Sequence, residues 1–425
     1  MHYGKGFVNI EVPQSRVLTI ADLKEMGETE SEMTHIERAL DNPIGHKGLN
    51  ALAEKAKKTV LLVDDNTRPT PIHRILPTLL NRLNQAGIED RDTHILIALG
   101  THRLMSEDEV RNKVGEETFE RVSVVNHYWK QKEMLVDVGR TPSGVPLIVN
   151  RSFLEANVRI GVGHIAPHCQ AGWTGGAKIV QPGICGAETT NYTHWLSARF
   201  DVRDLIGVAN NPVRLEIENV VRKIGFDFIL NLVLDEKGHV VKAVAGDFVK
   251  AHREGVKEAK KIFSTAVSTK ADIVVADAYP SGYGVDLRQA SKAIVSSYVA
   301  VKSGGTIILV APCPEGVSSE HPELLEFGFR PYDDLRKFVE TGAIKDLNAA
   351  ATGAQIGQIL ADKVKVVLYS EGISKRETTK LGIEHTENPQ NAVDEALERH
   401  GSNSKILFLN NACEILPTIS PNRIP

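Results

Sequence analysis

The chain has 425 residues, with 42% hydrophobic and 24% charged side chains and a formal net charge of −4. Because one hydrophobic core rarely serves so long a chain, we expect two domains, and the weak charge argues against a partner such as nucleic acid or an anionic membrane. Four widely spaced cysteines, and the lack of an apolar run that could be a signal peptide or a membrane span, predict a cytoplasmic protein.

Short apolar runs alternate with helical patterns through the first half of the chain. We predict strands there at 59–63, 94–99, 122–125 and 158–162. Helices are predicted at 72–85 and from about residue 106. Polar residues follow these strands repeatedly, at the edge where open α/β sheets bind their ligands.

The pattern changes between residues 201 and 249 and then returns to alternating strands and helices. In the changed region we predict a helix at 212–223, a hairpin of strands 227–234 and 240–245, and a helix at 250–264. The later strands are predicted at 273–276, 306–310, 364–368 and 406–409, with helices at 286–303, 355–361 and 391–400.

This alternation predicts an α/β fold of two domains, each with a mostly parallel sheet covered by helices, and an active site in the cleft between them. The first domain, residues 1–267, is expected to carry most of the reactive groups, with residues 410–425 as a further candidate part of it. Residues 268–409 are expected to form the second domain.

Two loops at strand ends carry candidate binding groups. After the first predicted strand, Arg68 offers a planar fork of donors that matches a carboxylate, and Asp65 could hold that fork or an imidazole. A helix cap made by Thr70 before Pro71 would explain the same loop without a ligand. His102 follows the next strand, so it could project into the same crevice as Arg68.

The stretch 161–194 has the most concentrated reactive groups. It places His164, His168 and His194 around the glycine-rich turn 172–177, which leads into Lys178. Glycines allow backbone amides to face an anion, and imidazoles beside an amine can hold a metal or move protons. Neither an ATP-binding P-loop nor the H-E-x-x-H pattern of zinc proteases is matched. A tight turn with a solvated lysine is the alternative.

Taken together, these motifs resemble the lactate racemase family, nickel-pincer-nucleotide enzymes that racemise or epimerise 2-hydroxy acids. The resemblance covers essentially the whole chain. It rests on DNTRPTP from Asp65, GTHR from Gly100, His168, AGWTGGAK from Ala171, the pair Pro182-Gly183, His194, DLRQASK from Asp286 after Gly282, and GGTIILVAPCPEG from Gly304.

The resemblance implies a cofactor, a pyridinium mononucleotide whose two sulfur-bearing substituents and ring carbon bind nickel. Lys178 would form a thioamide link to it, and His194 would supply the remaining nickel ligand, which suits an imidazole. The resemblance also places further cofactor contacts at Asp65, Thr67, Thr174, Gly175 and Gly176. Cofactor-biosynthesis proteins are therefore expected partners for loading, whereas nucleic acid and membranes are not, and no oligomeric state is predicted.

The implied reaction inverts C2 of lactate or a related 2-hydroxy acid. The Cα hydrogen lies beside an ionised carboxylate and is a poor acid, so it would leave as hydride while a histidine takes the hydroxyl proton, giving a planar 2-keto acid. His102 and His168 would form the acid/base pair, one for each enantiomer. Arg68 and Lys292 would hold the substrate carboxylate, and Gln289 would support the site.

Two positions at the pocket wall depart from the family pattern. Arg288 stands where lactate racemases carry Tyr, and the loop expected at 349–355 lacks the tryptophan that some members place over the substrate. Lactate specificity is therefore open, and a second substrate charge could reach Arg288. The alternatives are a zinc- or iron-dependent hydrolase or lyase that uses His102, His164 and His168, and a non-catalytic phosphate- or nucleotide-binding protein. In the leading hypothesis His164 is structural.

Overall fold

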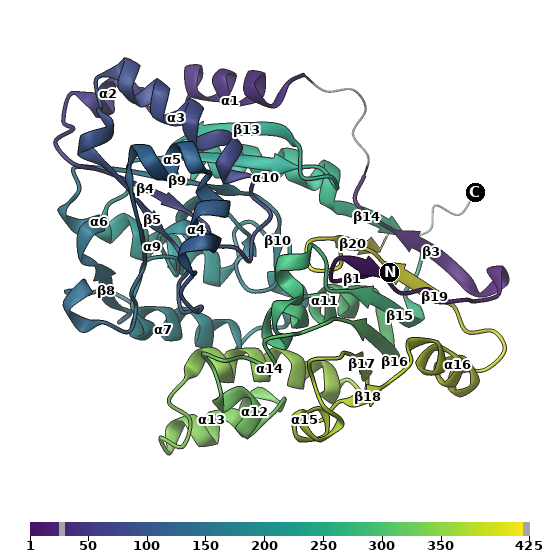
Figure 1. Cartoon of the computed structure of the whole chain (residues 1–425). Coiled ribbons are helices and arrows are strands. Elements are labelled where there is room, and N and C mark those ends of the chain that lie inside the picture. Colours follow the sequence, from purple (N-terminus) through teal and green to yellow (C-terminus); the bar gives the residue numbers. More distant parts are fainter. Residues whose placement is uncertain (25–29, 420–425) are drawn as a thin grey trace.

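The computed structural model describes residues 1–24 and 30–419, in which two six-stranded sheets form the centre (Figure 1). The first sheet has the order β13 (Val240–Gly246), β12 (Phe228–Leu234), β9 (Val158–His164), β4 (Thr59–Val63), β5 (Thr93–Ile97) and β6 (Ser123–Asn126). The second has the order β18 (Glu384–Thr386), β17 (Lys365–Tyr369), β16 (Val301–Val310), β15 (Ala271–Asp277), β19 (Ile406–Leu409) and β3 (Val17–Ala21). Within these sheets only the hairpin β12–β13 pairs antiparallel.

Strand β4 illustrates why apolar runs become the central strands. All five of its residues are buried, and they alternate between two hydrophobic clusters, with Val60 and Leu62 in one and Leu61 and Val63 in the other. A parallel strand covered on both faces needs such a continuous apolar run. The predicted α/β class with mostly parallel, helix-covered sheets is therefore confirmed.

Helices pack on both faces of the first sheet. The helices described in the first half of the chain are α1 (Glu32–Asp41), α2 (Leu49–Ala53), α3 (Ile72–Ala86), α4 (Glu107–Val114), α5 (Glu116–Arg121), α6 (Arg151–Glu155), α7 (Ala187–Ser197), α8 (Val202–Leu205), α9 (Pro212–Ile224) and α10 (Lys250–Phe263). The buried side of α3 joins the same cluster as Leu61, whereas α9 and α10 join the cluster of Val60. The sheet therefore lies between two helical layers.

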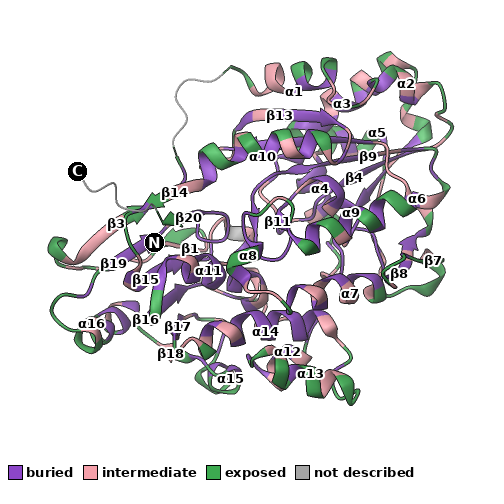
Figure 2. Cartoon of the chain, turned by 180° about the vertical axis from the view of Figure 1, so that it is seen from behind, coloured by how far each residue is buried: buried purple, intermediate pink, exposed green. Residues whose placement is uncertain are grey.

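The second half of the chain adds six more helices among the described residues, α11 (Leu287–Ala300), α12 (Glu323–Phe327), α13 (Tyr332–Glu340), α14 (Leu347–Ala361), α15 (Lys375–Leu381) and α16 (Pro389–His400). Four small two-stranded sheets complete the fold, β1 (His2–Tyr3) with β2 (Gly6–Phe7), β7 (Leu135–Arg140) with β8 (Pro146–Asn150), β10 (Pro167–His168) with β11 (Gly172–Trp173), and β14 (Ser264–Val267) with β20 (Leu416–Ile419). Figure 2 shows buried central strands and helices whose outer sides are exposed. None of the helices in the described part of the chain is long and apolar enough to span a membrane.

Two predicted elements near the cavity need correction. The helix predicted at 286–303 ends at Ala300, because Val301 pairs with Ala271 and begins β16. The loop expected at 349–355 is helical, since α14 begins at Leu347, where the Asp346 side chain accepts from the amides of the first turn. Its alanine-rich sequence is buried on most sides, so it lacks the apolar stripe that marks a surface helix.

Strand β3 does not follow the expected division at residue 267, because it belongs to the second sheet. β3 pairs with β19, so the N-terminal segment supplies the edge strand of the second sheet. At the other end of the chain, β20 pairs with β14, which immediately precedes the expected boundary. Of the candidate tail 410–425, residues 420–425 lie outside the part of the chain that the structure describes.

Candidate active site

The side chains predicted to form the site line one cavity between the two halves of the chain. It has an empty volume of about 1000 Å³. The predicted residues in its wall are Asp65, Arg68, His102, His168, Thr174, Gly175, Lys178, His194, Gln289 and Lys292. Thr67 lines a smaller adjoining cavity instead, and Gly176 is absent from both walls.

Three neighbouring strand ends supply the wall from the first half. β5, β4 and β9 lie side by side and run parallel, so the loops that follow them open at the same edge of the sheet. Asp65 follows β4, His102 follows β5 and His168 follows β9. Further along the chain, Lys178 lies in a short 3-10 helix (Gly176–Ile179) and His194 lies on α7.

The opposite wall is the start of α11. Asp286 caps this helix by accepting from the Gln289 amide at 2.6 Å. Just before it, Gly282 lies against the loop that follows β4, where an added Cβ would come within 2.8 Å of the Asn66 carbonyl oxygen. Glycine therefore allows the two halves to meet closely beside the cavity, which accounts for Gly282 in the motif.

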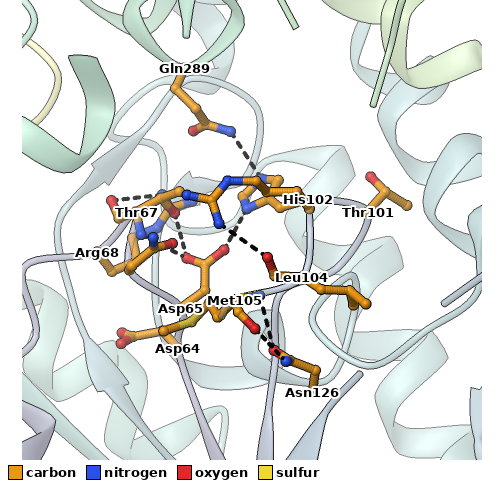
Figure 3. A network of polar contacts seen from close by, with 12 residues as sticks. Asp64, Asp65, Thr67, Arg68, Thr101, His102, Leu104, Met105, Asn126 and Gln289 are labelled. Carbon is orange, nitrogen blue, oxygen red and sulfur yellow. Dashed lines mark hydrogen bonds and ion pairs between the residues drawn. The ribbon is translucent and has the colours of Figure 1, made fainter. Parts of the chain in front are cut away.

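His102 and Asp65 form a buried dyad (Figure 3). His102 Nδ1 lies 2.6 Å from Asp65 Oδ2, and because a carboxylate only accepts, the imidazole donates. The amide nitrogen of Gln289 lies 2.9 Å from His102 Nε2, while the Gln289 oxygen accepts from Lys292. Burial lowers the pKa of His102 to about 4 even though Asp65 opposes the shift. At neutral pH the electron pair of the ring therefore lies on Nε2, which accepts from the Gln289 amide nitrogen.

The other two histidines have different hydrogen positions. His168 Nδ1 accepts from the amides of Gln170 and Ala171 at 3.1 and 3.2 Å, so its ring hydrogen lies on Nε2. His194 Nδ1 lies 2.9 Å from the Thr190 carbonyl oxygen and must donate to it, which leaves the electron pair on Nε2. Burial lowers the pKa of both rings, that of His194 to about 3. His194 is thus prepared as a metal ligand whose other nitrogen is fixed by the backbone.

Two cations from opposite halves share one aromatic ring. The Arg68 guanidinium lies 5.1 Å and the Lys292 amine 4.5 Å from the centre of the Tyr283 ring. Arg68 also donates to the Thr67 hydroxyl at 2.8 Å, which in turn donates to Asp65. Burial, together with Arg68, lowers the pKa of Lys292 to about 7. The pair offers an anion two donors in fixed positions.

Lys178 is a half-buried amine without a partner. Among the described residues, no hydrogen bond or ion pair reaches its Nζ. Burial lowers its pKa well below the ordinary value, and the charges of Arg68 and Lys292 add to this, which favours the uncharged and nucleophilic form of the amine. Because its side chain lines the cavity, the solvated lysine weighed as an alternative for this turn finds no support.

Several predicted contacts in the glycine turn are already engaged within the chain. The Thr174 hydroxyl donates to the His164 carbonyl oxygen at 2.7 Å and accepts from the Ala166 amide at 2.8 Å. The Gly176 amide donates to Asn231 Oδ1 at 2.7 Å. These two groups hold the turn against β9 and β12, so neither of them is free for the expected contact with the cofactor.

His164 and Thr70 form part of a structural network. The Thr70 hydroxyl donates to Asp64 at 2.5 Å and lies 2.9 Å from His164 Nδ1, and it makes no cap to α3, so the capping alternative is wrong. His164 Nε2 lies 2.9 Å from Glu414 Oε1. Both nitrogens of His164 are thus occupied.

Metal binding by the histidines alone finds no support in this arrangement. Within residues 1–24 and 30–419, no group of three or more His, Cys, Asp or Glu side chains is arranged to hold a metal ion. His164 has no free nitrogen, and His102 Nδ1 is committed to Asp65. The zinc or iron alternative therefore lacks its ligand set.

Sequence reasoning missed several polar residues around the cavity. Tyr283 donates to Glu414 Oε1 at 2.9 Å beneath the two cations. Asn348 on α14 accepts from Arg288 at 2.7 Å and donates to Thr101 at 3.0 Å. Tyr283 lies between Gly282 and Asp286 of the family motif, which could have drawn attention to it. Glu414 lies in no motif, so the local sequence did not point to it.

Comparisons with known proteins agree with this arrangement. The sequence matches the lactate racemase N-terminal domain over residues 3–203 and the lactate racemase C-terminal domain over residues 266–416. It is 34% identical over 323 residues to a lactate racemase of Thermoanaerobacterium thermosaccharolyticum, covering 75% of each chain. It is 30% identical to a lactate racemase of Lactiplantibacillus plantarum, covering 91% of each.

Solved structures show the same fold. The lactate racemase apoprotein of Thermoanaerobacterium thermosaccharolyticum superposes with a TM-score of 0.86 at 28% identity, covering 98% of each chain. A Thermotoga maritima protein gives a TM-score of 0.75 at 22% identity, covering 93% of this chain and all of that one. The fold together with the matches to both lactate racemase domains and to the two lactate racemases defines a two-domain α/β enzyme of the isomerase class. The chain belongs to the lactate racemase family.

Proposed function

We propose that this enzyme inverts the C2 centre of a 2-hydroxy acid by reversible hydride transfer through a 2-keto acid. The observation that carries the proposal is the meeting, in one cavity, of an Asp65–His102 dyad, an unpaired Lys178 and a pair of cations on a shared ring. The first group moves a proton, the second holds a cofactor and the third fixes a carboxylate. Because the relatives are lactate racemases, lactate or a related 2-hydroxy acid is the proposed substrate.

The residues fit a nickel-pincer nucleotide. The unpaired Lys178 amine, whose pKa is lowered, suits a covalent amide-type link, and His194 offers one imidazole electron pair in the same cavity. A single protein ligand suffices only when the organic cofactor supplies the remaining donors, which its sulfur and carbon atoms would do. When bound, such a cofactor accepts the Cα hydrogen of the substrate as hydride and returns it.

The chain's own residues would hold the substrate and move its hydroxyl proton. Arg68 and Lys292 bind the carboxylate, so that it stays fixed while the Cα face changes. His102 Nε2 takes the hydroxyl proton, since Asp65 stabilises the protonated ring. His168 exchanges the proton on the opposite face. Return of the proton to the oxygen of the 2-keto acid by one of these histidines would accompany the inversion.

Intact mass, nickel content and chirality test the proposal together. Protein made together with cofactor-biosynthesis proteins should carry an adduct that is lost in Lys178→Ala and retained in the exposed control Lys337→Ala. His194→Ala should keep the adduct and lose nickel. Chiral chromatography should show both enantiomers forming from either one of a 2-hydroxy acid. Full activity without adduct and nickel would refute the mechanism.

The same proposal includes a cytoplasmic location. The four cysteines are buried and free, as a reducing compartment would keep them. Fractionation of the native host should place the activity in the cytoplasm, and activity confined to a secreted fraction would contradict this.

A further inference from the structure

Arg288 is a cation of the cavity wall that the proposed reaction leaves without a role. Its Nη2 donates to Asn348 Oδ1 at 2.7 Å, whereas none of the described residues accepts from its Nη1 or from its Nε, which the protein covers. Asn348 is itself fixed, because its amide nitrogen donates to the Thr101 hydroxyl at 3.0 Å. A guanidinium held in place at the cavity wall, with Nη1 unpaired, can donate to an acceptor that comes with a ligand.

The cavity also contains more positive than negative charge. Asp64 is paired with Lys113 at 2.9 Å, and Asp65 is engaged by His102. In the proposed function Lys178 is consumed by the cofactor link, and Arg68 and Lys292 share one carboxylate. Within the part of the chain that the structure describes, no carboxylate forms an ion pair with Arg288. The charges of Asp286 and Asp346 act on it, but these side chains cap α11 and α14. An anion in direct contact with Arg288 is therefore expected on a ligand.

The position of Arg288 limits which ligand this is. Arg288 and Lys292 are four residues apart on α11, so their Cβ atoms are neighbours on one helix face, about 6 Å apart. An anion beside Arg288 would thus lie about one helical turn from the carboxylate held by Lys292. That separation suits two carboxylates joined by a chain of two or three carbons.

We propose that Arg288 binds a second carboxylate and that the substrate is a 2-hydroxy dicarboxylic acid of four or five carbons. This rests on the proposed function, because it assumes that Arg68 and Lys292 hold the first carboxylate. The wall around Arg288 supports it, since Asn348, Thr101 and Thr352 are polar where an apolar side chain would need apolar contacts. Arg288 lines the same cavity as His102 and His194, which places it near the reacting groups.

The phosphate of the cofactor is the other source of an anion, and the test separates the two. Loaded enzyme is assayed with L-malate, L-2-hydroxyglutarate and L-lactate as wild type, Arg288→Gln, Arg288→Lys and the exposed control Arg336→Gln. Calorimetric titration of the same proteins with succinate and propionate measures carboxylate binding without turnover. Intact mass and nickel content report cofactor loading.

Wild type is expected to use malate with a kcat/KM on the order of 100-fold above that for lactate. Arg288→Gln should lower the malate-to-lactate ratio and the affinity for succinate by on the order of 100-fold, with adduct and nickel retained. Arg288→Lys should recover part of the malate-to-lactate ratio and part of the affinity for succinate. Arg336→Gln should match wild type in both quantities.

Three results would overturn the assignment. Faster racemisation of lactate than of malate and 2-hydroxyglutarate by wild type would reject the dicarboxylate while leaving the proposed function intact. Loss of the adduct in Arg288→Gln would show that the residue serves the cofactor. If loaded wild type racemises no 2-hydroxy acid, the proposed function itself fails, and the substrate assignment fails with it.

Discussion

Replacing Glu414 tests a buried ion pair that joins the two halves beneath the cavity. Glu414 Oε1 accepts from His164 Nε2 and from the Tyr283 hydroxyl, both at 2.9 Å, and the three side chains are at most 3% exposed. Burial alone would lower the pKa of His164, but Glu414 and Asp64 outweigh it and raise the pKa above the ordinary value. The ring is therefore a buried cation between two carboxylates.

The size of the effect follows from what each substitution leaves behind. Glu414→Ala removes the oxygen that accepts from both His164 and Tyr283, and it leaves the buried charge of His164 uncompensated on one side. This should cost about 3–5 kcal/mol of unfolding free energy. Glu414→Gln keeps an acceptor oxygen without the charge, and should cost about 1.5–3 kcal/mol. Urea denaturation of the apoprotein measures both against Glu254→Gln, an exposed ion-pair member on α10 that should change stability little.

The pH dependence gives a sharper check. Because the folded pKa of His164 is raised, its stabilisation is fully present below the unfolded pKa of about 6.5 and is lost as pH rises through the folded value. The loss of unfolding free energy caused by Glu414→Gln should therefore be greatest near about pH 6 and smaller near about pH 9. Equal costs at both pH values, or a cost of Glu414→Ala below about 1 kcal/mol, would show that the ring is neutral.

Three further outcomes concern the loaded enzyme. Asp65→Asn should lower kcat by about 100-fold or more, because the protonated His102 loses its carboxylate; an unchanged steady-state kcat would remove the dyad from the mechanism. The kcat/KM should fall as pH rises above about 7, where Lys292 loses its proton, and Lys292→Arg should move that fall to higher pH. A rate profile with the same alkaline limb in both proteins would contradict this. Tyr283→Leu should raise KM more than it lowers kcat, since it removes the ring under both cations; steady-state kinetics with an unchanged KM would show that the ring does not position them.

The sequence predicted those parts of the fold in which local pattern and final burial agree. The strand 406–409 has the bounds of β19, and β4 was recognisable because its run of apolar residues is buried on both faces. β3 was missed because a short edge strand is only partly buried and its pairing partner lies almost 400 residues away. The helix over 349–355 was missed because a buried alanine-rich helix has no polar face.

The same distinction applies to the cavity. Residues within one motif or after one strand, such as Arg68, His102 and Lys178, could be chosen from their local sequence, and the structure brings them together. The expectation for Thr174 failed because its hydroxyl bonds to the backbone eight and ten residues before it, a contact that depends on how the turn folds back on β9. Local spacing therefore identified reactive residue types, but it did not show which polar groups the fold itself uses.

Glu414 connects these observations, because it acts on the cavity without lining it. It holds the Tyr283 hydroxyl, and the Tyr283 ring lies under Arg68 from the first half and Lys292 from the second. The spacing of the two cations therefore depends on the relative position of the halves, which the His164–Glu414 contact fixes at the end of β9. A carboxylate that binds both cations favours this arrangement over any in which the halves separate, so substrate binding and the contact between the halves stabilise each other.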